Sequence, residues 1–371
     1  MKMPQTVWFS LKVSPDDSAC GRPLGEVLRR KGVSLRLVRR LKRTGGIRVN
    51  GLPTRTDYRV QAGDLVELVG DPAERFPPAS GPGGTPYGVP SPVAPPPPVE
   101  PEEMPLCILY EDDAILAVAK PAGMLTHPVK RERSGTLANG VAYHLLRANG
   151  SNGTGAEHEV VVHPIHRLDR ETSGIVLFAR NPHAHHRLQQ ALDRGLVHKE
   201  YLALVTVVRC RSDGWPAFPT DGIIDWPLAP VPGHSSRQQV TPTGRPARTE
   251  YRCLELFPPR LALLAVHPVT GRTHQIRVHL AAAGWPILGD PLYGPGAEHQ
   301  ALFGAVLPPN ETHTLARMAL HARRLCFPHP NDNRELVLEA PIPDEMQRLL
   351  NALRQNGGAR HVPAPPKEAA R

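Results

Sequence analysis

The sequence lacks the cysteine pattern of a cross-linked or zinc-binding protein. Its five cysteines are odd in number, scattered along 371 residues and never spaced as Cys-x-x-Cys. This pattern suggests neither a disulfide framework nor a zinc site. No apolar run approaches the length of a membrane span, and the N-terminal residues Met1 to Pro4 lack the apolar core of a signal peptide. We therefore expect a cytoplasmic protein with free thiols and no membrane contact.

Nucleotide and metal motifs are also missing. There is no glycine-rich phosphate loop, no dinucleotide fingerprint and no metal-ligand spacing, so we expect neither a cofactor nor a metal. The run His183-x-His185-His186 resembles a ligand set, but no carboxylate or cysteine stands at matching spacing. Surface or RNA-facing histidines are the better interpretation. His274 and His279 fit hydrogen bonding within a helix better than catalysis.

Positive charge is concentrated near the N-terminus. The formal net charge of the chain is +9, with a pI near 9.6. Residues 21–50 alone contain ten basic residues and one acidic residue, Glu26, so the rest of the chain is close to neutral. A local surplus of this kind is typical of a protein that binds a polyanion.

The composition divides the chain into four parts. Residues 21–70 predict two short helices followed by a hairpin at Asn50-Gly51. Residues 71–105 contain thirteen prolines and predict an extended linker. Residues 106–345 mix strands with short helices and predict an α+β domain with a mainly antiparallel central sheet and flanking helices. A disordered tail is expected over residues 356–371.

The most informative stretch is His163-Pro-Ile-His-Arg-Leu-Asp-Arg-Glu-Thr-Ser-Gly-Ile175. It places the carboxylate of Asp169 among three cations or potential cations, and a Thr-Ser-Gly turn and an apolar run follow. The apolar run predicts a buried strand, so Asp169 would lie on a loop held against a rigid sheet. A structural Asp that caps the turn and pairs with a neighbouring Arg is the competing interpretation.

Three further segments bear on that choice. Lys120, in the turn Lys-Pro-Ala-Gly, could face a phosphate or only be solvated. Tyr201 lies in a predicted strand. Its side chain could be part of the core, or it could provide a surface on which an unstacked base packs. Arg277 lies beside the buried stripe of a short helix for which Thr273 is a plausible N-cap. A half-buried Arg needs an anion, and a carboxylate is the simplest partner.

Together these segments resemble the RNA pseudouridine synthases of the RluA family. Residues 166–174 resemble the catalytic motif of the family, residues 199–201 its tyrosine motif and residues 271–280 its arginine motif. Residues 289–294 and 321–325 resemble later landmarks, and the matches run in the family's order from about residue 106 to residue 345. Residues 21–70 resemble the ribosomal-protein S-four-type RNA-binding module that often precedes this catalytic domain.

The resemblance implies a role for each motif. Asp169 would be the essential carboxylate, which attacks C1′, attacks the base or removes a ribose proton; the sequence leaves these routes open. Tyr201 would stack on a flipped uracil and assist proton transfer at C5, and Arg277 would orient Asp169. Arg167 would fill the vacated base stack. The other implied RNA contacts are Arg170, His166, Lys199, Arg36, Arg39, Arg40 and Arg43.

The expected activity is the isomerisation of uridine in structured RNA, with large-subunit ribosomal RNA as the leading substrate and tRNA next. A monomer is the default, and the arginine-, proline- and glycine-rich composition suggests a bacterial source. One alternative is an RNA-binding or ribosome-assembly protein with a decayed catalytic domain. A more distant one is a metal-dependent hydrolase that uses His163, His166 and Asp169.

Overall fold

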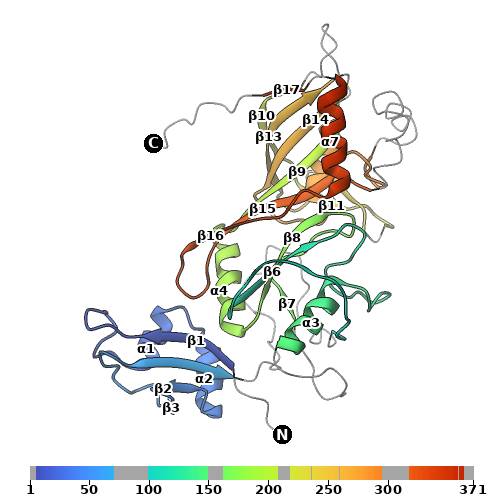
Figure 1. Ribbon diagram of the computed structural model, residues 1–371. Helices are drawn as coiled ribbons and strands as arrows, with labels where there is room; N and C mark the ends of the chain where they lie inside the picture. The colour runs from blue at the N-terminus through green and yellow to red at the C-terminus, as the bar shows by residue number, and fades with distance from the viewer. Residues whose placement is uncertain are drawn as a thin grey trace, which may run out of the picture.

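The computed structural model describes most of the chain (Figure 1). The described residues are 6–70, 99–148, 162–207, 218–234, 236–258, 260–294, 317–357 and 359–362. The linker predicted over residues 71–105 lies outside them, apart from residues 99–105. None of the helices in the described ranges combines the length and the apolar character that crossing a membrane requires.

The N-terminal unit, residues 6–70, has its own sheet and its own core. Its elements are β1 (Thr6–Lys12), α1 (Leu24–Arg30), α2 (Leu35–Thr44), β2 (Ile47–Val49), β3 (Leu52–Pro53) and β4 (Leu65–Gly70). The strand order is β1-β4-β2-β3, and all the pairings are antiparallel. The apolar stripes of both helices pack against this sheet to form one buried cluster.

Local signals set the boundaries within this unit. The hydroxyl of Ser34 accepts a hydrogen bond from the backbone N–H of Leu37 and so caps the N-terminus of α2. Gly45 ends that helix in the left-handed conformation. Asn50 and Gly51 both have positive φ, as a tight turn between β2 and β3 requires.

The N-terminal unit starts earlier than the predicted boundary at Gly21. Strand β1 pairs with β4, and its residues Trp8 and Phe9 are both buried in the core of the unit. The prediction missed this strand because Trp8 and Phe9 are adjacent, which breaks the alternation that marks a half-buried strand. A bulge in the pairing between Val7 and Phe9 allows both side chains to be buried.

The second part of the chain is built on an eleven-stranded sheet. The strand order is β10-β13-β14-β9-β15-β8-β6-β5, with β16 beside β15, β17 beside β13 and β7 beside β8. The strands are β5 (Cys107–Glu111), β6 (Ile115–Lys120), β7 (His163–Pro164), β8 (Ser173–Ala179), β9 (His198–Thr206), β10 (Asp221–Asp225), β13 (Arg248–Phe257), β14 (Leu261–Pro268), β15 (Leu320–Pro328), β16 (Glu335–Glu339) and β17 (Arg360–His361). Strands β11 (Leu228–Pro230) and β12 (Gln238–Val240) form a separate hairpin.

The large sheet is mixed, because β8 and β15 run parallel while their other neighbours are antiparallel. Gly174 makes this pairing possible: an added Cβ would lie 2.2 Å from the carbonyl oxygen of Ala322. The two strands are far apart in the sequence, so an alternation pattern alone could not reveal their relative direction.

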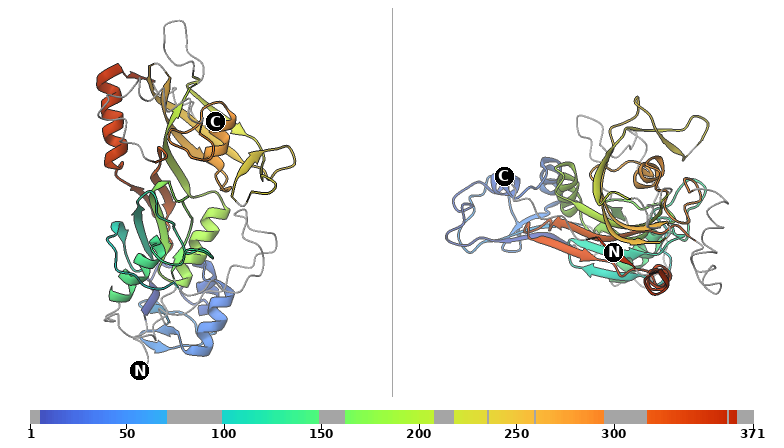
Figure 2. Two further views of the ribbon diagram at one scale, coloured as in Figure 1. Left: turned by 90° about the vertical axis from the view of Figure 1, so that its right-hand side faces the viewer. Right: turned by 90° about the horizontal axis from the view of Figure 1, so that it is seen from above.

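Helices cover both faces of the sheet (Figures 1 and 2). They are α3 (Leu137–Ala148), α4 (Pro182–Asp193), α5 (Gln275–Ala282) and α7 (Asp344–Gly357). Leu116 and Val118 of β6 share a core with α3, whereas Ile115 and Ala117 share a core with α4. This is the alternation that a strand buried on both faces produces. The large sheet and its helices therefore form one layered α/β body.

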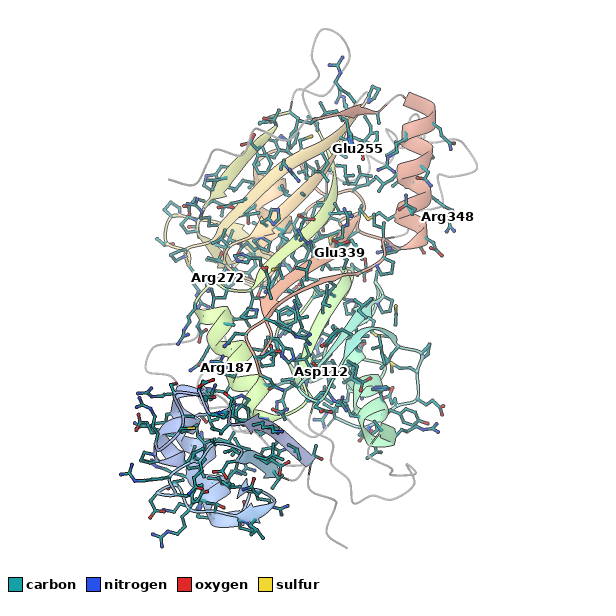
Figure 3. All side chains as sticks on the ribbon, turned by 60° about the vertical axis from the view of Figure 1, so that its left-hand side comes forward. Asp112, Arg187, Glu255, Arg272, Glu339 and Arg348 are labelled. Atoms are coloured by element: carbon teal, nitrogen blue, oxygen red, sulfur yellow. The ribbon has the colours of Figure 1, made fainter. Side chains whose placement is uncertain are left out.

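The N-terminal unit contacts this body at α4 (Figure 3). The ring of Phe9 packs edge-on against the ring of His183, with 5.0 Å between the centroids. Arg187 lies against Gly32, and it also donates a hydrogen bond to the carbonyl oxygen of Pro330. His183 is buried, so the expectation that it faces solvent or RNA is wrong; the docked β1 covers it.

The end of the chain also differs from the prediction. Disorder was expected from residue 356, but α7 extends to Gly357, and Arg360 and His361 of β17 pair with β13. The polar, glycine-containing sequence gave no sign of this short edge strand. Residues 363–371 of the expected tail lie outside the described residues.

Candidate active site

The loop that carries Asp169 joins β7 to β8 and is held by hydrogen bonds from residues far away in the sequence. The hydroxyl of Thr126 donates to the carbonyl oxygen of Leu168 (3.0 Å) and accepts from the N–H of Leu168 (3.1 Å). The N–H of Gly123 donates to the carbonyl oxygen of Arg170 (2.9 Å). Asp169 therefore lies between two anchored residues, and its side chain is 28% exposed.

Lys120 has a role that the sequence left open. Its ammonium group donates to the carbonyl oxygens of Pro121, Met124 and Arg170 at 2.8, 2.7 and 3.0 Å, and the residue is almost fully buried. It neither faces a free phosphate nor lies in solvent. Burial lowers the pKa of Lys120 to about 7, against the opposing influence of Asp169 and Glu171. Lys120 thus ties the turn after β6 to the loop that carries Asp169.

Arg277 bridges two carboxylates, those of Asp169 and Asp290. Its Nη1 donates to Oδ2 of Asp169 at 3.2 Å, and its Nε and Nη2 each donate to Asp290 at 2.8 Å. Arg277 is more deeply buried than predicted, with 4% of the residue exposed. The expected carboxylate partner is present, and so is a second one.

Asp290 fixes the position of the guanidinium. Besides Arg277, its Oδ1 accepts hydrogen bonds from the N–H groups of Leu292 (2.9 Å) and Tyr293 (3.1 Å). Burial alone would raise the pKa of Asp290, but the hydrogen bonds and charge of Arg277 outweigh it, so the pKa lies below its ordinary value. The sequence analysis assigned no role to Asp290, although this residue lies in the motif at residues 289–294. The predicted need of Arg277 for an anion could have pointed to Asp290 as a partner.

Helix α5 starts differently from the prediction. Its N-cap is His274 rather than Thr273, and His274 has the left-handed conformation (φ 55°) without a side-chain hydrogen bond to the helix. Instead, Gln275 turns its side chain back, and its Oε1 accepts from the N–H of Arg272 and the hydroxyl of Thr270. His279 was predicted to hydrogen-bond within a helix, but its ring contacts the hydroxyl of Thr249 and the carbonyl oxygen of Trp226, which both lie outside α5.

Tyr201 is buried in β9, near the start of β8. It lies opposite Ala322 of β15, and Ala322 lies opposite Gly174 of β8. Because neighbouring strands are about 4.8 Å apart, the backbone of Tyr201 is roughly 10 Å from that of Gly174. The strand order therefore brings the tyrosine motif and the aspartate loop to the same region of the sheet.

The four RNA-contact candidates of this part of the chain occupy different environments. Arg167 is exposed, and Arg170 is exposed but paired with Glu132 at 2.6 Å. His166 is buried, and its Nε2 accepts from the N–H of Leu177, so this ring presents no surface to RNA. Lys199 is partly exposed, and burial lowers its pKa to about 8.

The candidates in the N-terminal unit share one helix. Arg36, Arg39 and Arg43 of α2 are exposed, and Arg40 is partly buried. The opposite side of the helix carries Leu37, Val38 and Leu41, which are buried in the core of the unit. The helix therefore presents a basic surface.

Histidines elsewhere do not form a metal site in the part of the chain that the structure describes. No group of three or more His, Cys, Asp or Glu side chains there is placed to hold a metal ion. The ring of His163 lies 5.2 Å from the ring of His185, and burial lowers the pKa of His163 to about 2. Burial therefore favours the neutral form of His163.

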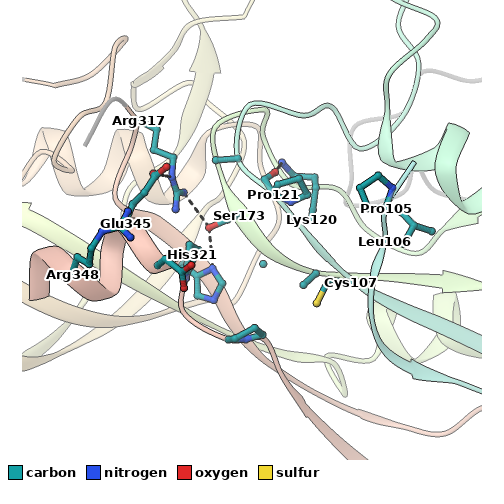
Figure 4. Close-up of a pocket in the computed structure, with 16 residues that line it drawn as sticks. Pro105, Leu106, Cys107, Lys120, Pro121, Ser173, Arg317, His321, Glu345 and Arg348 are labelled. Atoms are coloured by element: carbon teal, nitrogen blue, oxygen red, sulfur yellow. Dashed lines mark hydrogen bonds and ion pairs between the residues drawn. The ribbon is translucent and has the colours of Figure 1, made fainter. Parts of the chain in front are cut away.

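A cavity of about 710 Å³ lies close to the loop that carries Asp169 but is lined by other residues (Figure 4). Lys120 and Ser173 reach it from β6 and β8, Arg317 approaches from the segment before β15, and His321 approaches from β15 itself. The hydroxyl of Ser173 is 2.9 Å from Nδ1 of His321 and accepts from Arg317 at 3.3 Å. Asp169 and Arg277 do not line this cavity.

Comparison with known structures defines the fold class. The human protein RNA pseudouridylate synthase domain containing 4 is similar to this chain with a TM-score of 0.51 and 24% sequence identity. The similarity covers 67% of this chain and 92% of the human chain. The large mixed sheet with its helices is therefore a pseudouridine synthase fold.

Sequence comparison defines the family. A family described as RNA pseudouridylate synthase matches residues 114–282. Ribosomal large subunit pseudouridine synthase D of Nitrosomonas europaea is 38% identical over 253 residues, 68% of this chain and 67% of that protein. An uncharacterized RNA pseudouridine synthase of Bacillus subtilis is 34% identical over 315 residues, 84% of this chain and 87% of that protein. The chain belongs to the RluA-type family of RNA pseudouridine synthases, which are isomerases.

Proposed function

We propose that this synthase isomerises uridines of large-subunit ribosomal RNA, with Asp169 as its catalytic carboxylate. The ion pair of Asp169 with Arg277 is the observation that carries the assignment. A carboxylate beside a fixed guanidinium is oriented by it, which suits a group that attacks a carbon or removes a proton. The name of the relative from Nitrosomonas europaea supports ribosomal RNA as the substrate.

The reaction breaks the bond from N1 of uracil to C1′ of ribose and forms a bond from C5 to C1′. The C5 proton is lost and N1 gains a proton, so the product is an isomer and no electrons are exchanged with a partner. The target uridine has to leave its base stack before these atoms become accessible. Tyr201 would stack on the flipped uracil and assist proton transfer at C5, and Arg167 would occupy the vacated space in the RNA.

The N-terminal unit would bind the same RNA through phosphates. Its exposed α2 arginines form a basic surface, and contact with α4 fixes the unit beside the catalytic body. We place the RNA-binding module at residues 6–70 and the catalytic domain at about residues 99–362. We describe the catalytic sheet as mainly antiparallel, with β8 and β15 as its one parallel pair among the described residues. We also propose that the protein is a cytoplasmic monomer.

The test is to map pseudouridine in large-subunit ribosomal RNA and in tRNA transcripts after treatment with the wild type or with Asp169→Asn. The variant keeps the size and polarity of the side chain but removes its charge. We expect modification of ribosomal RNA by the wild type, none by the variant, equal RNA affinity and no effect of a chelator. Modification of tRNA alone would overturn the substrate assignment. An active variant would overturn the role of Asp169.

A further inference from the structure

His274 stands in an unusual position beside the catalytic carboxylate. It is one of three non-glycine residues with positive φ in the described ranges, and the other two are asparagines. Such a conformation is strained and persists where the surroundings require it. His274 is the N-cap of α5 but gives the helix no side-chain hydrogen bond, so capping does not explain the strain.

The ring of His274 makes both of its contacts within the site. Its Nδ1 is 2.9 Å from the hydroxyl oxygen of Tyr293, and its Nε2 is 3.8 Å from Oδ2 of Asp169. The side chain is 11% exposed, and the two rings meet nearly at right angles. The left-handed backbone at His274 therefore places its imidazole between Tyr293 and Asp169.

The hydrogen bonds of Tyr293 bear on which nitrogen of His274 carries the proton. The backbone N–H of Gln238, in β12, donates to the hydroxyl oxygen of Tyr293 at 2.8 Å. The hydroxyl proton of Tyr293 is then free to be donated to Nδ1 of His274. When Tyr293 donates this proton to Nδ1, a neutral His274 carries its own proton on Nε2, the nitrogen that faces Asp169.

The burial of His274 favours this neutral form. Burial lowers the pKa of His274 below its ordinary value; Arg277 and Arg167 act in the same direction, while Asp169 and Asp290 oppose them. The imidazole of His274 is then a neutral hydrogen-bond donor and not a second cation beside Arg277. Below its pKa the ring would be protonated on Nδ1 as well and could no longer accept from Tyr293.

Arg277 and His274 both approach the same oxygen of the Asp169 carboxylate. Arg277 donates to Oδ2, and Nε2 of His274 faces Oδ2. Among the described residues, none donates a hydrogen bond to Oδ1. The arrangement leaves Oδ1 to meet the substrate, while Oδ2 is held in place.

One short segment orients both of these groups. Asp290 holds Arg277, and Tyr293, three residues later, holds His274. The guanidinium of Arg277 also lies 5.1 Å from the centre of the Tyr293 ring. The segment from Asp290 to Tyr293 thus sets the two donors that face Asp169.

Building on the proposed function, we propose that His274 is a positioning residue for Asp169, with Tyr293 fixing its tautomer. Its Nε2–H approaches Oδ2 more closely when RNA fills the site, as catalytic hydrogen bonds commonly shorten in the substrate complex. The pair holds the carboxylate so that Oδ1 points to the flipped uridine.

The experiment compares His274→Gln with His274→Asn in single-turnover pseudouridine formation at saturating RNA. The amide nitrogen of Gln reaches about as far as Nε2, whereas the amide of Asn reaches only about as far as Nδ1. We expect Asn to slow the reaction about 10- to 100-fold, the effect of one hydrogen bond to a charged group, and Gln to restore most of the rate. RNA affinity should match the wild type in both variants, whereas the melting temperature should be lower in the Gln variant than in the Asn variant, because the left-handed backbone at this position suits Asn better.

Tyr293→Phe supplies an independent readout that leaves the histidine in place. Without the hydroxyl that donates to Nδ1, the neutral form of His274 is less favoured and its pKa rises. The acid limb of the pH–rate profile should therefore move to higher pH, while RNA affinity is unchanged. A purely structural role of Tyr293 would lower the rate without moving this limb.

The outcomes are separable from the fate of the proposed function. An inactive wild type would remove the function itself. If the wild type is active and Asp169→Asn is not, equal rates for His274→Asn, His274→Gln and the wild type would overturn the role of His274. Equal losses in both variants would also overturn it, because the donor would not matter. An unmoved acid limb in Tyr293→Phe would overturn the tautomer argument.

Discussion

The N-terminal unit and the active site differ in how far apart in the sequence their contacting residues lie. In the N-terminal unit, helix caps and a two-residue turn act between neighbours such as Ser34 and Leu37. In the active site, Arg277 contacts Asp169 across 108 positions, and Lys120 contacts Arg170 across 50. A surface that binds charge can be built locally, whereas a catalytic carboxylate needs partners that only the complete sheet brings together.

The largest effect should come from breaking the long-range pair in the active site. Arg277→Met leaves the buried Asp290 without its ionic partner, so we expect the free energy of unfolding to fall by about 3 to 5 kcal/mol. Activity should be lost at the same time, because Asp169 loses its oriented donor. Chemical denaturation and single-turnover assays measure the two effects. Full activity in Arg277→Met would contradict the site described above.

The pH dependence of stability provides the control for this pair. The pKa of Asp290 lies below its ordinary value, so its stabilisation is present above the unfolded-state pKa, about 3.9, and is lost as the pH falls through the folded-state pKa. The double variant Arg277→Met, Asp290→Asn lacks the charge pair. The wild type should therefore exceed it most in stability near neutral pH, with the difference shrinking below about pH 4. A constant difference would contradict the ion-pair assignment.

A smaller effect, on binding alone, should come from the basic surface of α2. The triple variant Arg36→Ala, Arg39→Ala, Arg43→Ala removes three exposed charges. We expect weaker RNA binding and a salt dependence of affinity reduced by up to about 2 to 3 in its logarithmic slope. The rate at saturating RNA should stay near that of the wild type. The control is Arg348→Ala, which removes an exposed charge on α7. An equal loss of RNA affinity in this variant would show that RNA binding does not depend on where the charge lies on the surface.

The smallest effect should be at the contact between the two parts. Burial, together with Arg187 and His186, lowers the pKa of His183 to about 4, so protonation opposes the packing of its ring against Phe9. The stabilisation is complete above the unfolded-state pKa, about 6.5, and is lost as the pH falls through about 4. Small-angle scattering should then show the N-terminal unit separating in acid. In the His183→Phe variant the N-terminal unit should stay docked in acid. Separation of the unit at the same pH in the wild type and in this variant would show that protonation of His183 is not the cause.

The sequence predicted what neighbouring residues determine. The two short helices within residues 21–70 and the Asn50-Gly51 turn were confirmed, because each depends on residues within a few positions. The need of Arg277 for a carboxylate was also correct. The role of Asp290, the direction of β8 relative to β15 and the position of His274 could not be predicted, since they depend on strand order and on one strained backbone position.

The burial of Lys120 and His183 also could not be predicted from the sequence. Both are polar residues that sequence reasoning placed near solvent or phosphate, and both are buried. Three carbonyl oxygens surround the Lys120 ammonium, and Phe9 of the docked unit covers His183. Neither environment is visible without knowing which distant segments meet.

The most direct test measures pseudouridine formation and RNA affinity together for Asp169→Asn and for the triple variant of α2. Our account predicts that Asp169→Asn binds RNA like the wild type and makes no pseudouridine at any RNA concentration. The triple variant should bind weakly and react at the wild-type rate once RNA is saturating. Pseudouridine formation by Asp169→Asn at a rate near that of the wild type would contradict the central claim.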